Sequence, residues 1–249
     1  MSHAQPLWRR AVAESLGTGL LVTVVVGSGI AAANLSPSDT GLQLLENSFA
    51  TALGLAVLIL MLGPVSGAHF NPAVSVIDWW LGQRSGNGLK GRDLAAYIPA
   101  QIGGGIAGAI LANLMYGQTV VSWSTTHRSA GHLYLGETVA TAGLILLIFA
   151  LAWSGRAQLA PLAVGAYIGA AYWFTSSTSF ANPAVTIGRA FSDTFAGISP
   201  SSVPGFIFFQ AVGAIVGAAL VLVLYPHAGQ AADDVVTPHS DTTHTGASA

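Results

Sequence analysis

The sequence contains no cysteine and few charged residues. Without a thiol the chain can form no disulfide, thiolate metal site or cysteine nucleophile. Only 7% of its residues are Asp, Glu, Lys or Arg, whereas a soluble domain usually carries roughly a quarter. So few charges cannot cover a surface that faces water. The net charge of −2 comes without a basic cluster, so we expect no nucleic acid partner.

Apolar residues make up 52% of the chain, and they gather in long stretches. Six stretches are long enough to cross a bilayer of ~30 Å. They lie near residues 11–33, 43–63, 93–116, 132–153, 159–178 and 204–225. The sequence therefore predicts an all-α membrane protein with six transmembrane helices.

Basic residues predict how these spans are oriented, because they favour the cytoplasmic side of a membrane. If the spans alternate, six of the eight basic residues share one side: Arg9, Arg10, Arg84, Lys90, Arg92 and Arg156. We therefore expect both termini in the cytoplasm and the protein in the plasma or inner membrane. The polar tail, residues 226–249, lacks apolar periodicity and is expected to be disordered.

Two shorter apolar stretches, residues 71–81 and 182–192, each begin with Asn-Pro-Ala. The first triplet is Asn71, Pro72 and Ala73, and the second is Asn182, Pro183 and Ala184. About 11 residues at 1.5 Å rise reach only ~16 Å, half of the membrane. Proline suits the first turn of a helix and asparagine the capping position before it. Each stretch is therefore predicted to be a re-entrant half-helix that starts near the midplane.

The two halves of the chain repeat each other, over about residues 8–116 and 132–225. The segment Glu14–Thr18 (ESLGT) pairs with Glu137–Thr141 (ETVAT). Farther on, both halves contain Gln-x-x-Gly-x-x-x-Gly, which suits close helix crossings, at Gln101, Gly104 and Gly108 and at Gln210, Gly213 and Gly217. With three spans in each half, the second copy enters the membrane upside down. Inverted repeats with broken helices place their site at the midplane, where two opposed positive helix ends repel cations.

The segment SGAHFNPAV and the doubled triplet resemble the aquaporin, or major intrinsic protein, family over about residues 8–225. The resemblance implies an aquaporin-like channel domain over residues 1–225, with one pore in each subunit of a homotetramer. In the family the two triplet asparagines donate N–H groups to the permeating molecule, which implies this role for Asn71 and Asn182. A capping role for the same side chains is compatible with it. No metal-ligand or nucleophile constellation is visible in the sequence, so we expect no metal, no cofactor and no enzymatic activity.

The main departure from the family pattern is Val185, which stands where most members have an arginine after the second triplet. By ungapped spacing, the other constriction positions of the family fall on Thr51, Ala170 and Ser179. All four residues are small and uncharged, which predicts a wide, arginine-free constriction. Arg189 lies one turn beyond Val185 and could line the outer vestibule, although we favour an (i, i+4) ion pair with Asp193.

Two acidic residues and one histidine need interpretation. Glu14 and Glu137 lie in predicted spans, where a carboxylate is costly and usually functional. They could relay protons, but their symmetry favours a structural role, in which each holds the backbone of a half-helix loop. His69 could gate the cytoplasmic side, or it could be a packed, hydrogen-bonded loop residue.

These features predict a passive channel for small uncharged solutes. The segment SFANPAVTI resembles bacterial aquaporins associated with arsenic resistance, which implies that metalloid hydroxides such as arsenous acid pass. The alternative within the same class is a general water and glycerol facilitator. The alternative of another class is an ion-coupled secondary transporter, since inverted repeats and broken helices occur there as well.

Overall fold

The computed structural model describes residues 5–85 and 88–225, so the predicted tail, residues 226–249, lies outside the described residues. The described residues form α-helices joined by loops and two short 3₁₀ helices. In chain order these are α1 (Leu7–Leu35), α2 (Thr40–Ser66), α3 (Pro72–Ser85), α4 (Gly91–Met115), α5 (Gly131–Trp153), η1 (Ala157–Leu159), α6 (Ala160–Phe174), α7 (Pro183–Arg189), η2 (Pro200–Ser202) and α8 (Val203–Leu224). The fold is all-α, as the sequence predicts.

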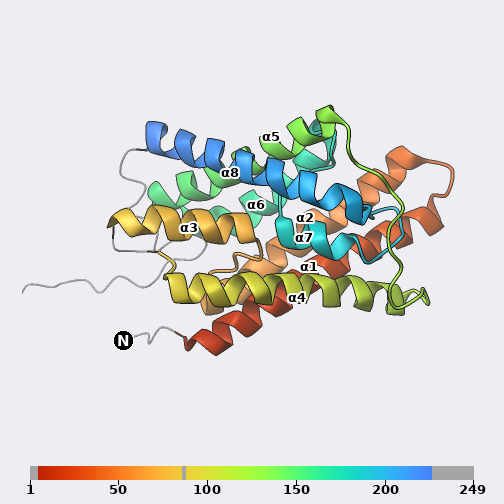
Figure 1. Cartoon of the computed structure of the whole chain (residues 1–249), viewed down its shortest axis with the longest axis horizontal. Helices are drawn as coiled ribbons and strands as arrows, with labels where there is room; N and C mark the ends of the chain where they lie inside the picture. Colours follow the sequence, from red (N-terminus) through yellow and green to blue (C-terminus); the bar gives the residue numbers. More distant parts are fainter. Residues whose placement is uncertain (1–4, 86–87, 226–249) are drawn as a thin grey trace, which may run out of the picture.

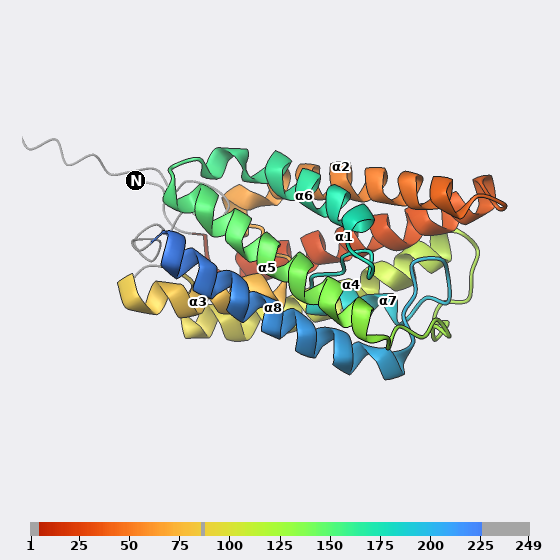
Figure 2. The same ribbon diagram turned by 90° about the horizontal axis from the view of Figure 1, so that it is seen from above.

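The long helices run side by side along the molecule, and two short helices lie between them (Figure 1). Helices α3 and α7 lie end to end between α4 and α8 (Figure 1), and Figure 2 shows α5 and α8 side by side from above. Their N-terminal ends face each other near the middle of the molecule. This is the arrangement predicted for the two half-helices, with α3 entering from one end and α7 from the other.

Five helices of the described chain are long and apolar enough to cross a membrane: α1, α2, α4, α5 and α8, the last taken together with η2. The sixth predicted span, residues 159–178, is shorter than expected, because α6 has 15 residues and ends at Phe174. The chain leaves the helix there and reaches left-handed backbone at Thr178 and Ser179, with φ of 62° and 51°. This turn carries the chain inward to Asn182. Similarly, α7 ends at Arg189, earlier than the predicted 192.

Glycines let the helices of each half cross closely. On α4, the positions Gly104 and Gly108 lie against backbone carbonyls of α1. On α8, a Cβ added at Gly213 would come within 2.5 Å of the Thr138 carbonyl oxygen on α5. Because no larger residue fits at these positions, the two Gly-x-x-x-Gly segments bring α1 against α4 and α5 against α8.

The start of α1, the end of α3 and the start of α4 lie at the same end of the molecule (Figure 1). Arg9, Arg10, Lys90 and Arg92 therefore share this end. A carboxylate oxygen of Asp93 accepts a 2.9 Å ion-pair contact from Arg10, which ties α1 to α4. The distribution of basic residues thus follows the alternation of the helices.

Candidate pore and its constriction

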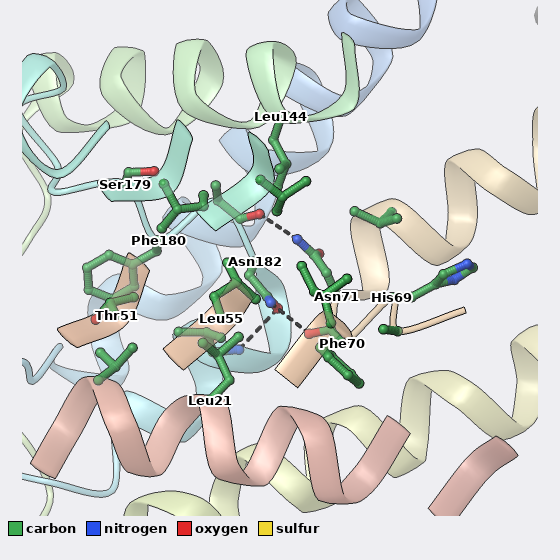
Figure 3. Close-up of a pocket in the computed structure, with 18 of the residues that line it drawn as sticks. Leu21, Thr51, Leu55, His69, Phe70, Asn71, Leu144, Ser179, Phe180 and Asn182 are labelled. Atoms are coloured by element: carbon green, nitrogen blue, oxygen red, sulfur yellow. Dashed lines mark hydrogen bonds between the residues drawn. The ribbon is translucent and has the colours of Figure 1, made fainter. Parts of the chain in front are cut away.

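The two triplet asparagines meet in the middle of the molecule, and each bonds to the loop of the other half. The Asn71 amide donates to the carbonyl of Ala181 at 2.8 Å, and the Asn182 amide donates to the carbonyl of Phe70 at 2.8 Å (Figure 3). Their side-chain oxygens accept from the backbone of their own half-helices, at Ala73 and Ala184. Each asparagine therefore caps a helix and joins the two loops at once.

The residue before each asparagine has an unusual backbone conformation. Phe70 and Ala181 have φ of 49° and 48°, in the left-handed region that residues with a Cβ rarely adopt. Such positions cost of order 1–3 kcal/mol each and persist only where the surroundings hold them. The same strain at equivalent positions of both halves indicates that both loops need this path.

A buried carboxylate holds the first loop in place. Glu14 of α1 is fully buried and accepts backbone N–H groups of His69 at 3.0 Å and of Phe70 at 2.7 Å. The Gln101 amide donates to the same carboxylate at 2.8 Å and to the Ser75 hydroxyl at 3.0 Å. The carboxylate thus satisfies backbone donors that would otherwise be buried without partners.

The second loop is held by a carboxylate in the equivalent way, at the two residues that precede its asparagine. Glu137 of α5 is fully buried and accepts backbone N–H groups of Phe180 and Ala181, both at 2.9 Å. The Gln210 amide donates to it at 2.6 Å and to the Thr186 hydroxyl at 2.9 Å. The two carboxylates therefore occupy equivalent places, and their oxygens bond to amide and hydroxyl donors, as a loop-holding role requires.

A cavity of about 60 Å³ runs past the two asparagines. One water molecule needs about 10–15 Å³ of such space, so the cavity can hold a few. Among the residues that line it are Thr51, Asn71, Ser179, Asn182 and Val185. Figure 3 shows Thr51, Ser179 and Phe180 toward one end and His69 toward the other, with the asparagines between them. Three of the four predicted constriction residues therefore face one cavity.

The fourth predicted constriction residue, Ala170, does not line this cavity. It is exposed on the surface of α6, and Ile168 and Tyr172 face the cavity from this helix instead. The Tyr172 hydroxyl shares a 3.2 Å hydrogen bond with Thr51. The ungapped spacing chose the wrong residue because α6 ends early and the loop before Asn182 is irregular.

Arg189 faces the cavity, and it does not form the ion pair with Asp193 that we favoured. Its side chain is buried at 2% exposure, its Nε donates to the carbonyl of Ala196, and its guanidinium carbon lies 3.4 Å from the centre of the Phe180 ring. The Asp193 carboxylate instead accepts from Thr125, at 2.9 Å from the backbone N–H. The cavity therefore has a cationic residue after all, one turn beyond Val185.

His69 has features of both interpretations. It lines the cavity, yet it is buried and its Nδ1 lies 3.0 Å from the Ser75 hydroxyl. Its ring also packs edge-on against Tyr97, with centroids 5.6 Å apart, and its Nε2 lies 3.8 Å from an Asp78 oxygen. The structure thus places it as a buried, well-packed residue that is also among those lining the cavity.

The amino-acid sequence matches the family model of the major intrinsic proteins over residues 1–181. The chain belongs to the major intrinsic protein family. It is 49% identical to the aquaglyceroporin AqpS of Rhizobium meliloti over 86% of this chain and 89% of that protein. It is also 32% identical to a glycerol uptake facilitator protein of Pseudomonas aeruginosa, over 88% of this chain and 90% of the other.

The X-ray structure of the aquaglyceroporin from Plasmodium falciparum has the same fold, with a TM-score of 0.65 at 21% identity over 90% of this chain and 99% of that one. Together with the apolar helices, membership of the major intrinsic protein family makes this chain an integral membrane channel rather than an enzyme.

Tyr172 and Phe180 are among the cavity residues of this major intrinsic protein that sequence reasoning missed. A tyrosine inside an apolar span was a signal, because a buried hydroxyl usually needs a polar partner, which Thr51 supplies. Phe180 could not be assigned from the sequence, because its ring position depends on the left-handed backbone of the loop.

Proposed function

We propose that this chain is a passive channel for small uncharged solutes, including water, glycerol and the neutral metalloid hydroxide arsenous acid. Relatives named as an aquaglyceroporin and as glycerol uptake facilitators support the solute class. The observation that carries the proposal is Val185, which lines the cavity at the place where the family resemblance expects a long charged side chain.

The cavity wall suits a neutral polyol. An amide nitrogen carries two hydrogens, and Asn71 and Asn182 each use one to bond the facing loop. The second hydrogen of each can serve a solute hydroxyl. Apolar side chains such as Leu21 and Leu144 line the same cavity and suit the carbon side of a polyol.

Arsenous acid fits the same description, because its undissociated form is an uncharged trihydroxide of about the size of glycerol. Trivalent arsenic binds thiolates, and thiolates are the reactive form of cysteine. The chain has no cysteine, so such a solute would meet no thiol in the pore. Val185, Thr51 and Ser179 add no long side chain to this part of the cavity, which Tyr172, Phe180 and Arg189 also line.

The second candidate is a general water and glycerol facilitator that does not favour metalloids. Arg189 supports this candidate, because it returns a guanidinium to the cavity and leaves less open width than the four small residues alone would. An ion-coupled transporter has less support, since the two buried carboxylates are engaged by backbone and amide donors.

We further infer that the protein resides in the cell membrane with both termini in the cytoplasm, as a homotetramer. The clustering of basic residues at the end where α1 starts supports this orientation. The tetramer rests on the family resemblance. The end of the cavity near Arg189 is then the outer mouth.

The test is the substitution Val185→Arg, compared with Val185→Met, which adds length without charge. Water, glycerol and arsenous acid fluxes are measured by stopped-flow light scattering and arsenic uptake on proteoliposomes of matched protein content. We expect Val185→Arg to reduce glycerol and arsenous acid flux about tenfold, equivalent to ~1.4 kcal/mol of added barrier, while water flux falls less. Val185→Met should have a smaller effect on both solutes.

Unchanged glycerol and arsenous acid flux in Val185→Arg would contradict the proposal, because Val185 could not then border the path. If the wild type passes glycerol but excludes arsenous acid, the general facilitator is the correct function.

A further inference from the structure

Two arginines lie against one aromatic ring at the end of the cavity. The Arg189 guanidinium carbon is 3.4 Å from the centre of the Phe180 ring, in van der Waals contact. The guanidinium carbon of Arg128, from the loop between α4 and α5, is 5.3 Å from the centre of the same ring. A cation over an aromatic face is attracted by the negative face of the ring, with distances within ~6 Å being favourable. Phe180 thus accommodates two positive charges.

Neither arginine has an acidic partner. Within residues 5–85 and 88–225, no carboxylate lies within ion-pair distance of Arg128 or Arg189. The nearby acid Glu137 accepts backbone and amide donors, and Asp193 accepts from Thr125. The positive charge at this end of the cavity is therefore not cancelled by a direct contact.

Both side chains are also fixed in place by neighbouring carbonyls. The Nε of Arg189 donates to Ala196, and the Nε of Arg128 donates to Gly197 at 3.0 Å. A planar guanidinium held by one carbonyl and one ring has little freedom to swing across the cavity. Arg189 can therefore contribute a positive charge at the cavity wall without crossing the cavity, and Val185 adds no long side chain at its own position.

We propose that Arg189 determines charge selectivity in this channel, with Phe180 and Ala196 as its positioning partners and Arg128 adding to the positive potential. A single arginine at position 185 would set both the width of the pore and its charge. Here Val185 sets the width, and Arg189, one turn farther along α7, sets the charge. This rests on the proposed function. It predicts that the pore admits a neutral solute and rejects a cation of the same shape.

Urea and guanidinium are suitable probes, because both are small, planar and similar in size but only guanidinium is charged. The variants are Arg189→Gln, which removes the charge, and Arg189→Lys, which keeps it. The matched control is Arg156→Gln, which removes an exposed positive charge between α5 and α6. Urea and guanidinium permeabilities are measured on proteoliposomes of matched content, after size-exclusion chromatography shows a folded protein.

We expect the wild type to pass urea and exclude guanidinium. Arg189→Gln should raise guanidinium permeability roughly tenfold or more, since a unit charge a few ångström from the path at an effective dielectric constant of about 20 is a substantial barrier. Its urea permeability should change less than about twofold. Arg189→Lys and Arg156→Gln should still exclude guanidinium.

A folded Arg189→Gln channel that passes urea and still rejects guanidinium would overturn the proposal, as would equal leakage through Arg189→Lys. If Arg189→Gln does not fold, Arg128→Gln decides, because it removes the second positive charge beside the Phe180 ring and should raise guanidinium permeability several-fold; no change would overturn the proposal. A wild type that passes neither urea nor glycerol contradicts the proposed function instead.

Discussion

At the scale of single residues, Val185 and Arg189 present very different side chains to the cavity. Val185 borders the cavity without charge or length, and Arg189 brings a guanidinium to it from one turn farther along α7. Each triplet asparagine combines two structural tasks, since Asn71 and Asn182 cap their own helices and bind the opposite loop. Both asparagine side chains thus hold the structure together and line the cavity.

Glu137 offers a prediction at this scale. Replacing it by Leu leaves the N–H groups of Phe180 and Ala181 without an acceptor, at about 1–3 kcal/mol for each buried donor. Glu137→Gln keeps one acceptor and should be milder. The measure is the thermal unfolding midpoint of the detergent-solubilised channel, with water flux as a second readout. If neither change affects the unfolding midpoint or the water flux, Glu137 does not hold the loop. The same pair of changes at Glu14 should have the same effects.

Residue positions were predictable from the sequence where helix periodicity or the triplets governed them. Val185 and Arg189 share a helix face because four residues make about one turn, and both line the cavity. The pairing of Arg189 with Asp193 was wrong, because α7 ends at Arg189 and Asp193 therefore lies outside the helix. Ala170 was wrong because the loop that follows Phe174 does not keep helical spacing.

At the scale of elements, close crossings of long helices leave room for the half-helices. Gly104 and Gly108 let α4 approach α1, and Gly213 and Gly217 let α8 approach α5. The half-helices then pack in the remaining space, α3 against α4 and α8, and α7 against the same two helices. Each half-helix therefore packs against one long helix from each half of the chain.

Two adjacent glycines on α4 make a matched test of the crossing. A Cβ at Gly104 would collide with the Ser15 carbonyl on α1, whereas a Cβ at Gly103 would meet nothing within 4 Å. We expect Gly104→Ala to destabilise the channel by about 1–3 kcal/mol. Gly103→Ala should be neutral or stabilising by up to ~1 kcal/mol, because alanine favours a helix over glycine. Equal thermal unfolding midpoints for the two variants would show that the crossing is not tight.

Element types were easier to predict than element lengths. Long apolar stretches and the proline after each asparagine predicted the spans and the half-helices. The ends of α6 and α7 were not predictable, because they depend on tertiary bonds such as those from Glu137 to the loop backbone at Phe180 and Ala181. The residues around a helix end do not reveal a hydrogen-bond partner that lies on another helix.

At the scale of the whole molecule, the inverted repeat builds one half of the pore twice. Glu14 with Gln101, and Glu137 with Gln210, hold their loops by the same set of bonds in opposite directions. The described chain therefore has a centre fixed from both sides, and the residues that line it offer neutral donors and one positive charge near an end. Such a centre suits diffusion of a neutral molecule, and among the described residues no carboxylate lines the cavity.

Passive conduction is the central claim, and glycerol uptake into proteoliposomes tests it most directly. The initial uptake rate is measured against external glycerol concentration, with and without imposed proton and sodium gradients. The account predicts a rate that rises linearly with concentration, depends weakly on temperature, is the same with and without each gradient, and stops when internal and external glycerol are equal. Accumulation of glycerol above its external concentration under either gradient would contradict it.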